Sequence, residues 1–308
     1  MNMTMLATYV HRIDPFVFEF SPGIGIRWYG LAYVAGFLAA FLLVRMMAKR
    51  RLTPLEVDRV PDVVLAVAVG VIVGGRLGYC LFYRPDLLTD FSNAFPYWGV
   101  LAMNRGGMAS HGGIIGVIIA GWWFARRSGQ RPTHIMDLIA LTAPIGIFFG
   151  RVANFINGEL LGRAAPETLP WAVKFPQEVV NWPARNPEAL ASPEFGRVLS
   201  MVQELYGRSA ESTHMMLQRV ALAARENDAV ATALEPLLTP RHPSQLYAAL
   251  LEGLVVFVVL AWLWRLPRKP GFIAGAAMVL YPIVRIISEA FRMPDLHLGF
   301  RQFDRQTP

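Results

Sequence analysis

Six apolar stretches, each long enough to cross a lipid bilayer, constrain the fold of this chain more than any other feature of its sequence. A hydrocarbon core about 30 Å thick is spanned by about 20 mostly apolar helical residues. The stretches lie at residues 28–45, 63–83, 108–125, 138–157, 246–264 and 271–291. Hydrophobic residues make up 54% of the chain, against roughly 45–50% in an ordinary soluble domain. The sequence therefore predicts an all-α integral membrane protein with about six transmembrane helices.

A polar segment separates the fourth stretch from the fifth. It is rich in Pro, Glu, Arg and Ser, and it contains a stretch of helical character near residues 197–235. Such a segment is expected outside the membrane. We therefore predict spans one to four within residues 1–157, a head at 158–242, spans five and six within 243–292, and a polar tail at 293–308.

Lysine and arginine are unevenly divided between the two sides of the predicted membrane domain. The connections after spans one, three and five hold Arg45, Lys49, Arg50, Arg51, Arg59, Arg126, Arg127, Arg131, Arg265, Arg268 and Lys269. The other side offers Arg12, Arg27, Arg84 and Arg105. Because short cytoplasmic loops carry the excess of positive charge, the N-terminus and the head are expected to face outward.

Several ionisable residues fall inside the predicted spans, where each charge costs on the order of 2.5–3.5 kcal/mol at the helix centre. They are Arg76, Arg151, Glu252, Arg285 and Glu289. A rise of 1.5 Å per residue puts the three arginines about 20 Å into a core about 30 Å thick. With the predicted orientation, these charges gather in one layer in the outer half of the membrane.

The sixth span carries a stripe of polar side chains at helical spacing. Its members are Tyr281, Arg285, Glu289 and Arg292. Such a stripe faces protein or water rather than lipid. Arg285 and Glu289, at i and i+4, are also compatible with a purely structural ion pair. The functional alternative is phosphate, which guanidinium groups bind bidentately, and an outer-leaflet phospholipid headgroup is the nearest such ligand.

Other partners and prosthetic groups have little support in the sequence. The net charge is +7, but the basic residues cluster at the ends of apolar segments rather than along one stripe, so no nucleic-acid partner is expected. Cys80 is the only cysteine and lies in an apolar run, which fits a small buried hydrophobic residue and excludes a disulfide framework. Because no metal-binding or phosphate-loop motif occurs, we expect neither a metal nor a cofactor.

The most specific motif lies at the end of the fourth span, in the run GRVANFINGELLG at residues 150–162. Its Gly-Arg-x-small-Asn-apolar-apolar-Asn-x-Glu-x-x-Gly pattern resembles the signature of the prolipoprotein diacylglyceryl transferase family. Three further segments resemble that family in the same order, namely RWYGL at 27–31, SHGG at 110–113 and RHPSQLY at 241–247. Together with the polar stripe, the resemblance covers residues from about 11 to 295.

The resemblance implies a bacterial enzyme of the inner membrane. Members of the family take the diacylglyceryl group from phosphatidylglycerol and place it on the lipobox cysteine of a prolipoprotein signal peptide. A thioether forms and glycerol phosphate leaves. The expected partners are therefore phosphatidylglycerol, a prolipoprotein signal peptide with its lipobox, and the lipid bilayer, with the active site near the periplasmic side.

The resemblance also implies a set of site residues. Arg151 and Arg285 would hold the phosphate and stabilise charge on the leaving group. His111 would accept the thiol proton, although a lone membrane histidine is more often a helix-end hydrogen bonder. The substrate-binding residues are expected to be Arg151, Tyr29, Asn154, Glu159, Gly162, Tyr281, Glu289, Arg292 and His242.

Some of these residues also have plain structural interpretations. Asn154 fits an interhelical hydrogen bond as well as contact with the headgroup or with Arg151. Tyr29 and Tyr281 fit aromatic anchors at the membrane interface. The two glutamates, Glu159 and Glu289, are expected to position the arginines. Arg76 matches no motif, and its role stays open.

Two departures from the family pattern and one rival function accompany the prediction. The head is longer than in compact members, between about 178 and 235, and the family's last span, expected beyond Pro294, is missing from the residues given. The rival function is a secondary transporter of an anionic solute, which also buries arginines and glutamates. A transporter predicts an internal repeat, and the first three spans do not resemble the last three.

Overall fold

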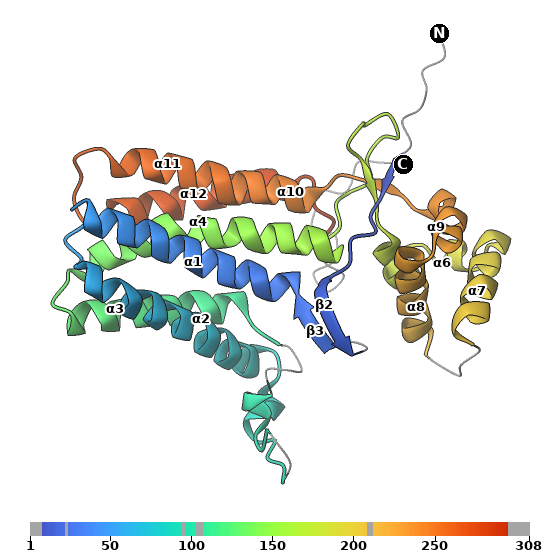
Figure 1. Ribbon diagram of the computed structural model, residues 1–308, viewed down its shortest axis with the longest axis horizontal. Coiled ribbons are helices and arrows are strands. Elements are labelled where there is room, and N and C mark those ends of the chain that lie inside the picture. The colour runs from blue at the N-terminus through green and yellow to red at the C-terminus, as the bar shows by residue number, and fades with distance from the viewer. Residues whose placement is uncertain (1–7, 22–23, 94–95, 103–106, 208–211, 295–308) are drawn as a thin grey trace. The chain divides into compact units, whose positions relative to one another are not determined.

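The computed structural model describes residues 8–21, 24–93, 96–102, 107–207 and 212–294 (Figure 1). The predicted tail beyond residue 294 and the loop residue Arg105 lie outside these described residues. The chain divides into two compact units. The first combines Met1–Tyr33, Phe148–Gly253 and Ile283–Pro308, and the second combines Val34–Ile147 and Leu254–Pro282.

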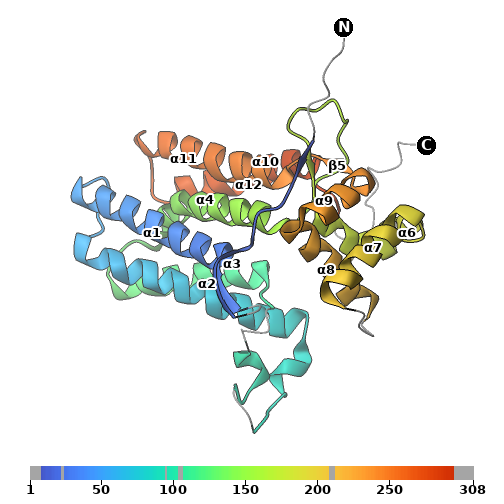
Figure 2. The ribbon, with the colours of Figure 1, turned by 45° about the vertical axis from the view of Figure 1, so that its right-hand side comes forward.

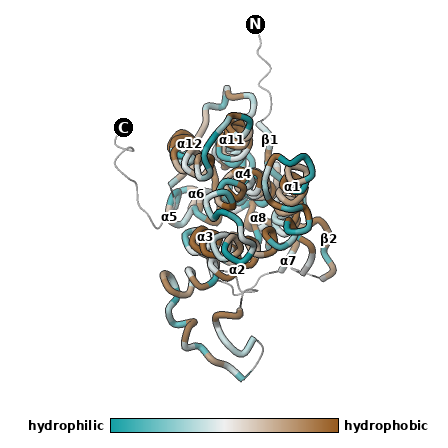
Figure 3. The backbone as a smooth tube through the Cα atoms, turned by 90° about the vertical axis from the view of Figure 1, so that its left-hand side faces the viewer, coloured by the Kyte–Doolittle hydropathy of each residue, from teal (hydrophilic) through white to brown (hydrophobic). Residues whose placement is uncertain are grey.

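Five helices are long and apolar enough to cross a membrane, which confirms the all-α membrane class. They are α1 (Trp28–Lys49), α2 (Val60–Phe82, preceded by the 3-10 turn Val57–Arg59), α4 (Pro132–Asn157), the helix Ser244–Trp264 and α12 (Phe272–Glu289). The helix Ser244–Trp264 consists of α10 (Ser244–Ala248), a π-helical stretch (Ala249–Val255) and α11 (Val256–Trp264). Figure 3 shows brown hydrophobic residues along these helices and teal ones in their connections.

A sixth helix, α3 (Ser110–Arg127), forms where the third span was predicted. It is not among the five apolar helices, because it begins with a polar Ser-His pair and ends with two arginines. The third predicted span, at residues 108–125, therefore stays a prediction as a membrane crossing.

Helices α2 and α3 pack backbone against backbone within the second unit. A Cβ at Gly74 would lie 2.4 Å from the Gly112 carbonyl oxygen, and one at Gly116 would lie 2.0 Å from the Gly70 oxygen. Real side chains do not tolerate such contacts, so glycine permits an approach that alanine would prevent. Figures 1 and 2 show the two helices side by side.

Arg76 of α2 is hydrogen-bonded to the loop that precedes α3. Its Nε donates to the Val100 oxygen at 2.7 Å, and its Nη1 to the Gly107 oxygen at 3.0 Å. Its Nη2 donates to the oxygens of Gly99 at 2.7 Å and Ala102 at 3.1 Å. Arg76 is only 4% exposed. This answers the question left open by the sequence, because the guanidinium donates to four backbone carbonyls that precede α3.

Buried polar side chains also join the helix ends in the second unit. Asp137 of α4 accepts hydrogen bonds from the backbone N–H groups of Gly271 at 2.7 Å and Ala274 at 2.8 Å. These are donors at the start of α12 that have no partner within that helix. His134 Nε2 and Thr53 Oγ1 lie 2.7 Å apart in the same buried region.

The head has an apolar core of its own within the first unit. It contains α5 (Trp182–Arg185), α6 (Pro187–Leu190), α7 (Pro193–Tyr206), α8 (Thr213–Glu226) and α9 (Asp228–Leu234), the last three seen together in Figure 2. Ser192, Ser212 and Asn227 cap the N-termini of α7, α8 and α9. The residues buried among these helices include Trp182, Phe195, Val198, Val202, Leu217, Val220, Val230 and Leu234.

The first unit also contains short strands, and the all-α prediction did not include them. A three-stranded sheet has the order β1-β4-β5, formed by Tyr9–Val10, Val173–Lys174 and Pro240–Arg241. Tyr9 pairs with Val173 in parallel, and Val173 with Arg241 antiparallel. A separate antiparallel pair joins β2 (Phe16–Ser21) to β3 (Ile24–Arg27), immediately before α1.

Candidate functional site

A buried carboxylate binds two arginines from two other helices in the first unit. Glu252 lies in the π-helical stretch, Arg151 on α4 and Arg285 on α12. Arg151 Nη2 lies 3.0 Å from Glu252 Oε2, and Arg285 Nη1 lies 2.9 Å from Glu252 Oε1. The Glu252 side chain is fully buried, whereas those of Arg151 and Arg285 remain 20% and 27% exposed. The structure therefore brings together the two arginines that the sequence analysis proposed.

Two further α12 residues complete this charged cluster. Ser288 Oγ donates to Glu252 Oε1 at 2.5 Å. Arg285 Nη2 lies 2.6 Å from Glu289 Oε2, so the expected i, i+4 pair is confirmed. This pair is not an isolated surface feature, because Arg285 is also bound to Glu252 on another helix. The charges in this cluster balance, with two guanidinium groups and two carboxylates.

Glu252 lies in a stretch of unusual helix geometry. π-helical turns are rare and often occur at functional sites. A Cβ at Gly253 would lie 2.7 Å from the Phe148 Cβ, so this helix passes very close to α4. Glu252 is visible in the sequence as a charge at membrane depth, but no motif there marks it as a site residue. Its partners lie 101 and 33 positions away, which no local pattern reveals.

The signature motif folds into a tight turn at the end of α4. Gly158 has φ +70° and Leu160 has φ 53°, both in the left-handed region. The turn brings Glu159 back onto the helix end, where its carboxylate accepts hydrogen bonds at 3.2 Å from Asn154 Nδ2 and Asn157 Nδ2. The expectation that Glu159 positions the arginines stays a prediction, and the hydrogen bonds described for its carboxylate come from these two asparagines.

Gly162, His242 and Arg292 meet behind this turn. A Cβ at Gly162 would lie 2.0 Å from the His242 carbonyl oxygen, so only glycine fits there. Gly162 forms a β-bridge with Arg292, and the His242 N–H donates to the Arg163 oxygen at 3.0 Å. The His242 ring lies 5.4 Å from that of Phe291. Three predicted site residues from distant segments are therefore neighbours through their backbones.

One buried ion pair that the sequence analysis missed joins the head to this turn. Arg241 Nε lies 2.6 Å from Glu178 Oε2, and Arg241 Nη1 donates to the Gly162 oxygen at 3.0 Å. Glu178 is 2% exposed and also accepts from the Thr239 N–H and hydroxyl, each at 3.1 Å. Arg241 stands in the quoted RHPSQLY segment, but nothing in the sequence marks Glu178 as its partner.

His11 and Arg225 support the turn from the other side. Arg225 Nη2 donates to the Asn157 oxygen at 2.8 Å, and burial lowers the pKa of Arg225. His11 is 1% exposed and packs against the rings of Phe155 and Phe175. Burial, with the nearby Arg225 charge as a second cause, lowers the pKa of His11 from 6.5 to about 4. His11 is therefore neutral at physiological pH.

The remaining predicted site residues lie on three helices. His111 is the second residue of α3 and is exposed, next to the closely packed Gly112. Tyr29 is the second residue of α1, with its ring 5.3 Å from that of Tyr33. Tyr281 lies on α12, one turn before Arg285, as the helical spacing predicted. Tyr281, Arg285 and Glu289 thus lie on α12 as the predicted stripe requires, whereas Arg292 lies beyond the end of this helix and forms a β-bridge with Gly162, so its place in the stripe was wrong. The roles of these residues stay predictions.

The charged cluster has the chemistry of an anion site inside a membrane protein. Two guanidinium groups are held in an apolar helical setting by one buried carboxylate, and part of each remains accessible. Guanidinium is the side-chain group best suited to bind phosphate or carboxylate in two-point contact. The fold therefore defines an integral membrane protein, and the cluster gives it guanidinium groups of the kind that bind anionic ligands.

Comparison with known proteins specifies the family. The sequence model of prolipoprotein diacylglyceryl transferase matches residues 15–305. A phosphatidylglycerol–prolipoprotein diacylglyceryl transferase of Bdellovibrio bacteriovorus is 49% identical over 304 residues, covering 95% of this chain and 86% of the relative. The enzyme of the same name from Azospirillum brasilense is 39% identical, covering 96% and 88%, and that of Photorhabdus laumondii is 36% identical, covering 94% and 84%. The chain belongs to the prolipoprotein diacylglyceryl transferase family, as its motifs predicted.

Proposed function

We propose that this chain transfers the diacylglyceryl group of phosphatidylglycerol to the lipobox cysteine of prolipoproteins, the first step of bacterial lipoprotein maturation. The cysteine sulfur forms a bond to the glyceryl carbon while the bond from that carbon to the phosphate oxygen breaks. The electron pair leaves with glycerol phosphate, and the thiol proton passes to a base. Family membership supports this reaction, and the observation that carries it here is the pair of arginines on buried Glu252.

Arg151 and Arg285 hold the phosphate in this proposal. Arg151 uses Nε and Nη2 on Glu252, and its side chain is 20% exposed, so the outer edge of the guanidinium faces the ligand. Glu289, with a 47% exposed side chain, is the more accessible partner of Arg285. A phosphate would compete with Glu289 for Arg285 while Glu252 keeps both arginines in place. The arginines then stabilise the charge on the departing phosphate.

His111 accepts the thiol proton in this proposal. The thiolate is the competent nucleophile, and imidazole is the side chain best suited to take its proton near neutral pH. Support comes from the family-like SHGG segment and from the exposure of His111 at the start of α3. The alternative role of a helix-end hydrogen bonder predicts that a His111→Gln variant keeps its activity.

The turn at the end of α4 shapes the binding site in this proposal. Asn154 and Glu159 contact each other and together present polar groups to the headgroup. Gly162, His242 and Arg292 hold the backbone behind them, as the close Gly162–His242 approach supports. Tyr29 and Tyr281 also contact the substrate in this proposal, which the family-like RWYGL segment and the place of Tyr281 on α12 support.

The protein lies in the bacterial inner membrane as a multi-pass protein, with the N-terminus and the head at 158–242 on the periplasmic side. The excess of lysine and arginine in the connections after spans one, three and five supports this orientation. With that orientation, Arg151 and Arg285 face the outer leaflet. The segments 1–157 and 243–292 form the membrane domain, and the prolipoprotein signal peptide enters it from the bilayer.

A reconstituted transfer assay tests the function. Purified full-length protein in nanodiscs containing phosphatidylglycerol is mixed with a lipobox peptide, and mass spectrometry follows diacylglyceryl addition to the cysteine. We expect addition by the native chain, a large loss in Arg151→Ala, and no loss in Arg84→Ala, a control at an exposed loop arginine. No addition by folded native protein, or undiminished addition by Arg151→Ala, overturns the proposal.

A secondary transporter is the alternative from another class. The relatives reported above are all named as transferases, and none of them as a transporter. Uptake of an anionic solute by proteoliposomes containing this protein, without any peptide modification, is the result that would favour the transporter.

A further inference from the structure

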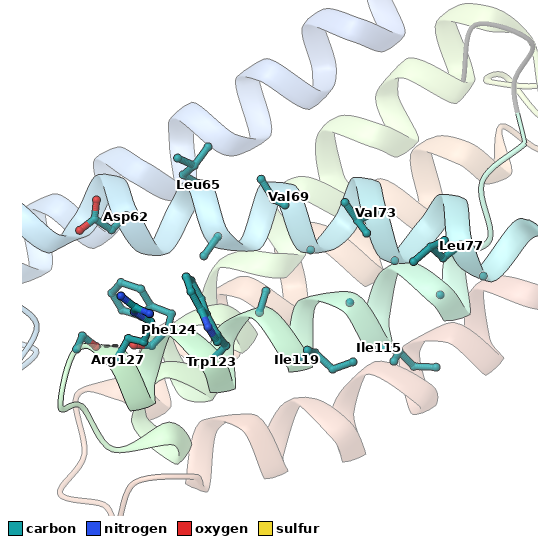
Figure 4. Close-up of a pocket in the computed structure, with 18 of the residues that line it drawn as sticks. Asp62, Leu65, Val69, Val73, Leu77, Ile115, Ile119, Trp123, Phe124 and Arg127 are labelled. Atoms are coloured by element: carbon teal, nitrogen blue, oxygen red, sulfur yellow. Dashed lines mark hydrogen bonds between the residues drawn. The ribbon is translucent and has the colours of Figure 1, made fainter. Parts of the chain in front are cut away.

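An apolar groove runs along α2 and α3 in the second unit (Figure 4). Its volume is about 1150 Å³, above the roughly 300–1,000 Å³ of common small-molecule pockets. None of the residues that line it belongs to the charged cluster around Glu252. The groove therefore includes none of the residues proposed to hold the phosphate, although one of its lining residues, Gly112, follows His111 in the chain.

The close glycine packing of the two helices creates the groove. Where Gly74 meets Gly112 and Gly116 meets Gly70, the helices touch through their backbones, and larger side chains stand beside this seam. The lining residues include Leu65, Val69 and Val73 on α2 and Ile119 and Trp123 on α3, which Figure 4 shows along the two neighbouring helices. Each of these five side chains is at least 49% exposed. The groove thus offers a continuous apolar surface to molecules in the bilayer.

One end of the groove carries charge. Arg59 and Asp62 lie there at the start of α2, with Arg59 Nη1 3.6 Å from Asp62 Oδ2. Arg127 lies there at the end of α3, with its guanidinium carbon 5.5 Å from the centre of the Trp123 ring. Two guanidinium groups against one carboxylate leave a net positive charge. An arginine beside a tryptophan at a helix end is typical of the level of lipid headgroups.

The charge distinguishes between the two molecules that such a groove fits. A secretory signal peptide carries a positively charged segment before its apolar helix, and like charges at the groove end disfavour it. A phospholipid with an anionic headgroup has the opposite charge and an apolar chain to match the walls. We propose that this groove binds an anionic phospholipid of the bilayer, with its phosphate between Arg59 and Arg127 and an acyl chain against α2 and α3.

The length of the groove predicts which part of it a lipid chain contacts. From Asp62 to Phe82, α2 rises about 30 Å at 1.5 Å per residue, the whole thickness of a hydrocarbon core. A lipid belongs to one leaflet, so its chain reaches only the half next to the charged end. It contacts Leu65, Val69 and Trp123 but not Leu81, whereas a transmembrane peptide helix fills the whole length.

Photoreactive lipids test this directly. Phosphatidic acid and phosphatidylcholine with identical diazirine-bearing acyl chains are placed separately in nanodiscs with the full-length protein, and labelled peptides are mapped by mass spectrometry. We expect phosphatidic acid to label the α2 and α3 peptides several-fold more, with adducts confined to the half next to Arg59 and Arg127. Equal labelling by the two lipids would mean only non-specific lipid contact and would overturn the proposal.

Matched variants locate the headgroup. The Arg59→Gln/Arg127→Gln double variant is expected to lose the preference for phosphatidic acid. Arg126→Gln is the control, because Arg126 lies beside Trp122 on the same helix end but does not line the groove, and it should keep the preference. A preference that survives in the double variant contradicts the proposed headgroup site.

Competition and activity measurements separate this site from the transferase function. Displacement of the lipid by a lipobox peptide that labels the full length of α2 would overturn the lipid assignment in favour of a peptide helix. Arg151→Ala should abolish transfer but leave groove labelling unchanged. If the transfer assay fails while the groove is still labelled, only the proposed transferase function is overturned. If transfer occurs without the expected groove labelling, only the proposed lipid site is overturned.

Discussion

Arg76 and Arg151 look alike in the sequence, yet the structure gives them different surroundings. Arg76 is 4% exposed and donates to four backbone carbonyls of the loop before α3. Arg151 has a 20% exposed side chain and pairs with the buried carboxylate of Glu252. The first arginine is enclosed by the chain it stabilises, whereas the second is anchored on one side and accessible on the other.

Arginines at membrane depth are thus bound either by neutral carbonyls or by a carboxylate, and we propose a structural role for the first kind and ligand binding for the second. Carbonyl groups are neutral acceptors fixed by the backbone, and a guanidinium surrounded by them cannot turn to a phosphate without leaving those carbonyls unpaired. A carboxylate occupies one edge of the guanidinium and leaves another edge for an anion. Partner type and exposure, rather than depth, therefore separate the two roles.

The largest expected effect is on activity. Arg151→Ala should lower kcat/KM for transfer by about 10²–10³-fold, as removal of one group that stabilises developing negative charge typically does. Arg76→Ala, measured per folded molecule in the same assay, should lose far less. Equal losses of kcat/KM in Arg151→Ala and Arg76→Ala would show that the two arginines do not differ in their roles.

The next effect is on stability and concerns Arg76. Arg76→Ala removes a buried cation and leaves its carbonyl partners unpaired, so the free energy of unfolding should fall by about 3–5 kcal/mol. Thermal unfolding in detergent, with limited proteolysis of the segment at residues 96–107, measures this loss. Arg84→Ala, at an exposed arginine paired with Asp86, serves as the control and should unfold like the native chain. An unchanged stability of Arg76→Ala would mean that the loop does not depend on this side chain.

A third test concerns His11, which lies near Arg225, another arginine that donates to a backbone carbonyl of a turn. Because the pKa of His11 falls from 6.5 to about 4 on folding, the unfolded chain binds more protons between these values. Stability contributed by neutral His11 is therefore complete above pH 6.5 and is lost as the pH falls toward 4. By linkage, the loss approaches about 3 kcal/mol at pH 4.

Unfolding measured from pH 7 to pH 4 checks this prediction. The His11→Gln variant should show a flatter pH profile, since it lacks the titrating group. His214→Gln, at an exposed histidine next to Gln218, should keep the native profile. An unaltered profile in His11→Gln would show that another group causes the pH dependence.

The smallest effect concerns the two carboxylates bound to Arg285. A double-mutant cycle of Glu252→Gln with Arg285→Gln should give a coupling energy between about 0.5 and 3 kcal/mol, typical of residues in direct contact. The same cycle with Glu289→Gln should give less than about 1 kcal/mol, because Glu289 is half exposed. A larger coupling for Glu289 would reverse the order of the two partners.

Much of the membrane fold follows from local sequence. Each predicted span forms a helix, and the Tyr281-to-Arg285 spacing gives the expected helical stripe. The head was less predictable. Its apolar residues are spread over short helices that bury them only against one another, so the segment appears polar along the chain although Phe195 and Trp182 are buried in its core.

The candidate site was predicted only where its residues are close together in the sequence. The signature run gave Arg151, Asn154, Glu159 and Gly162, because a turn and its helix end are contiguous in sequence. Glu178 and its pairing with Arg241 could not be found this way, since the two residues are 63 positions apart. Local sequence patterns do not predict a contact between residues that are far apart in the chain, because such a contact depends on how separate segments pack.

The sequence by itself determined the apolar lengths that select membrane helices, the presence of arginines within them, and the turn at residues 157–162. These depend on neighbouring residues, whose spacing along a helix is constant. Only the tertiary structure decided which group each arginine binds. Backbone carbonyls occur at every residue and carry no sequence signal, so nothing in the chain marks those that Arg76 binds. Glu252 meets Arg151 only because two helices pack closely at Gly253.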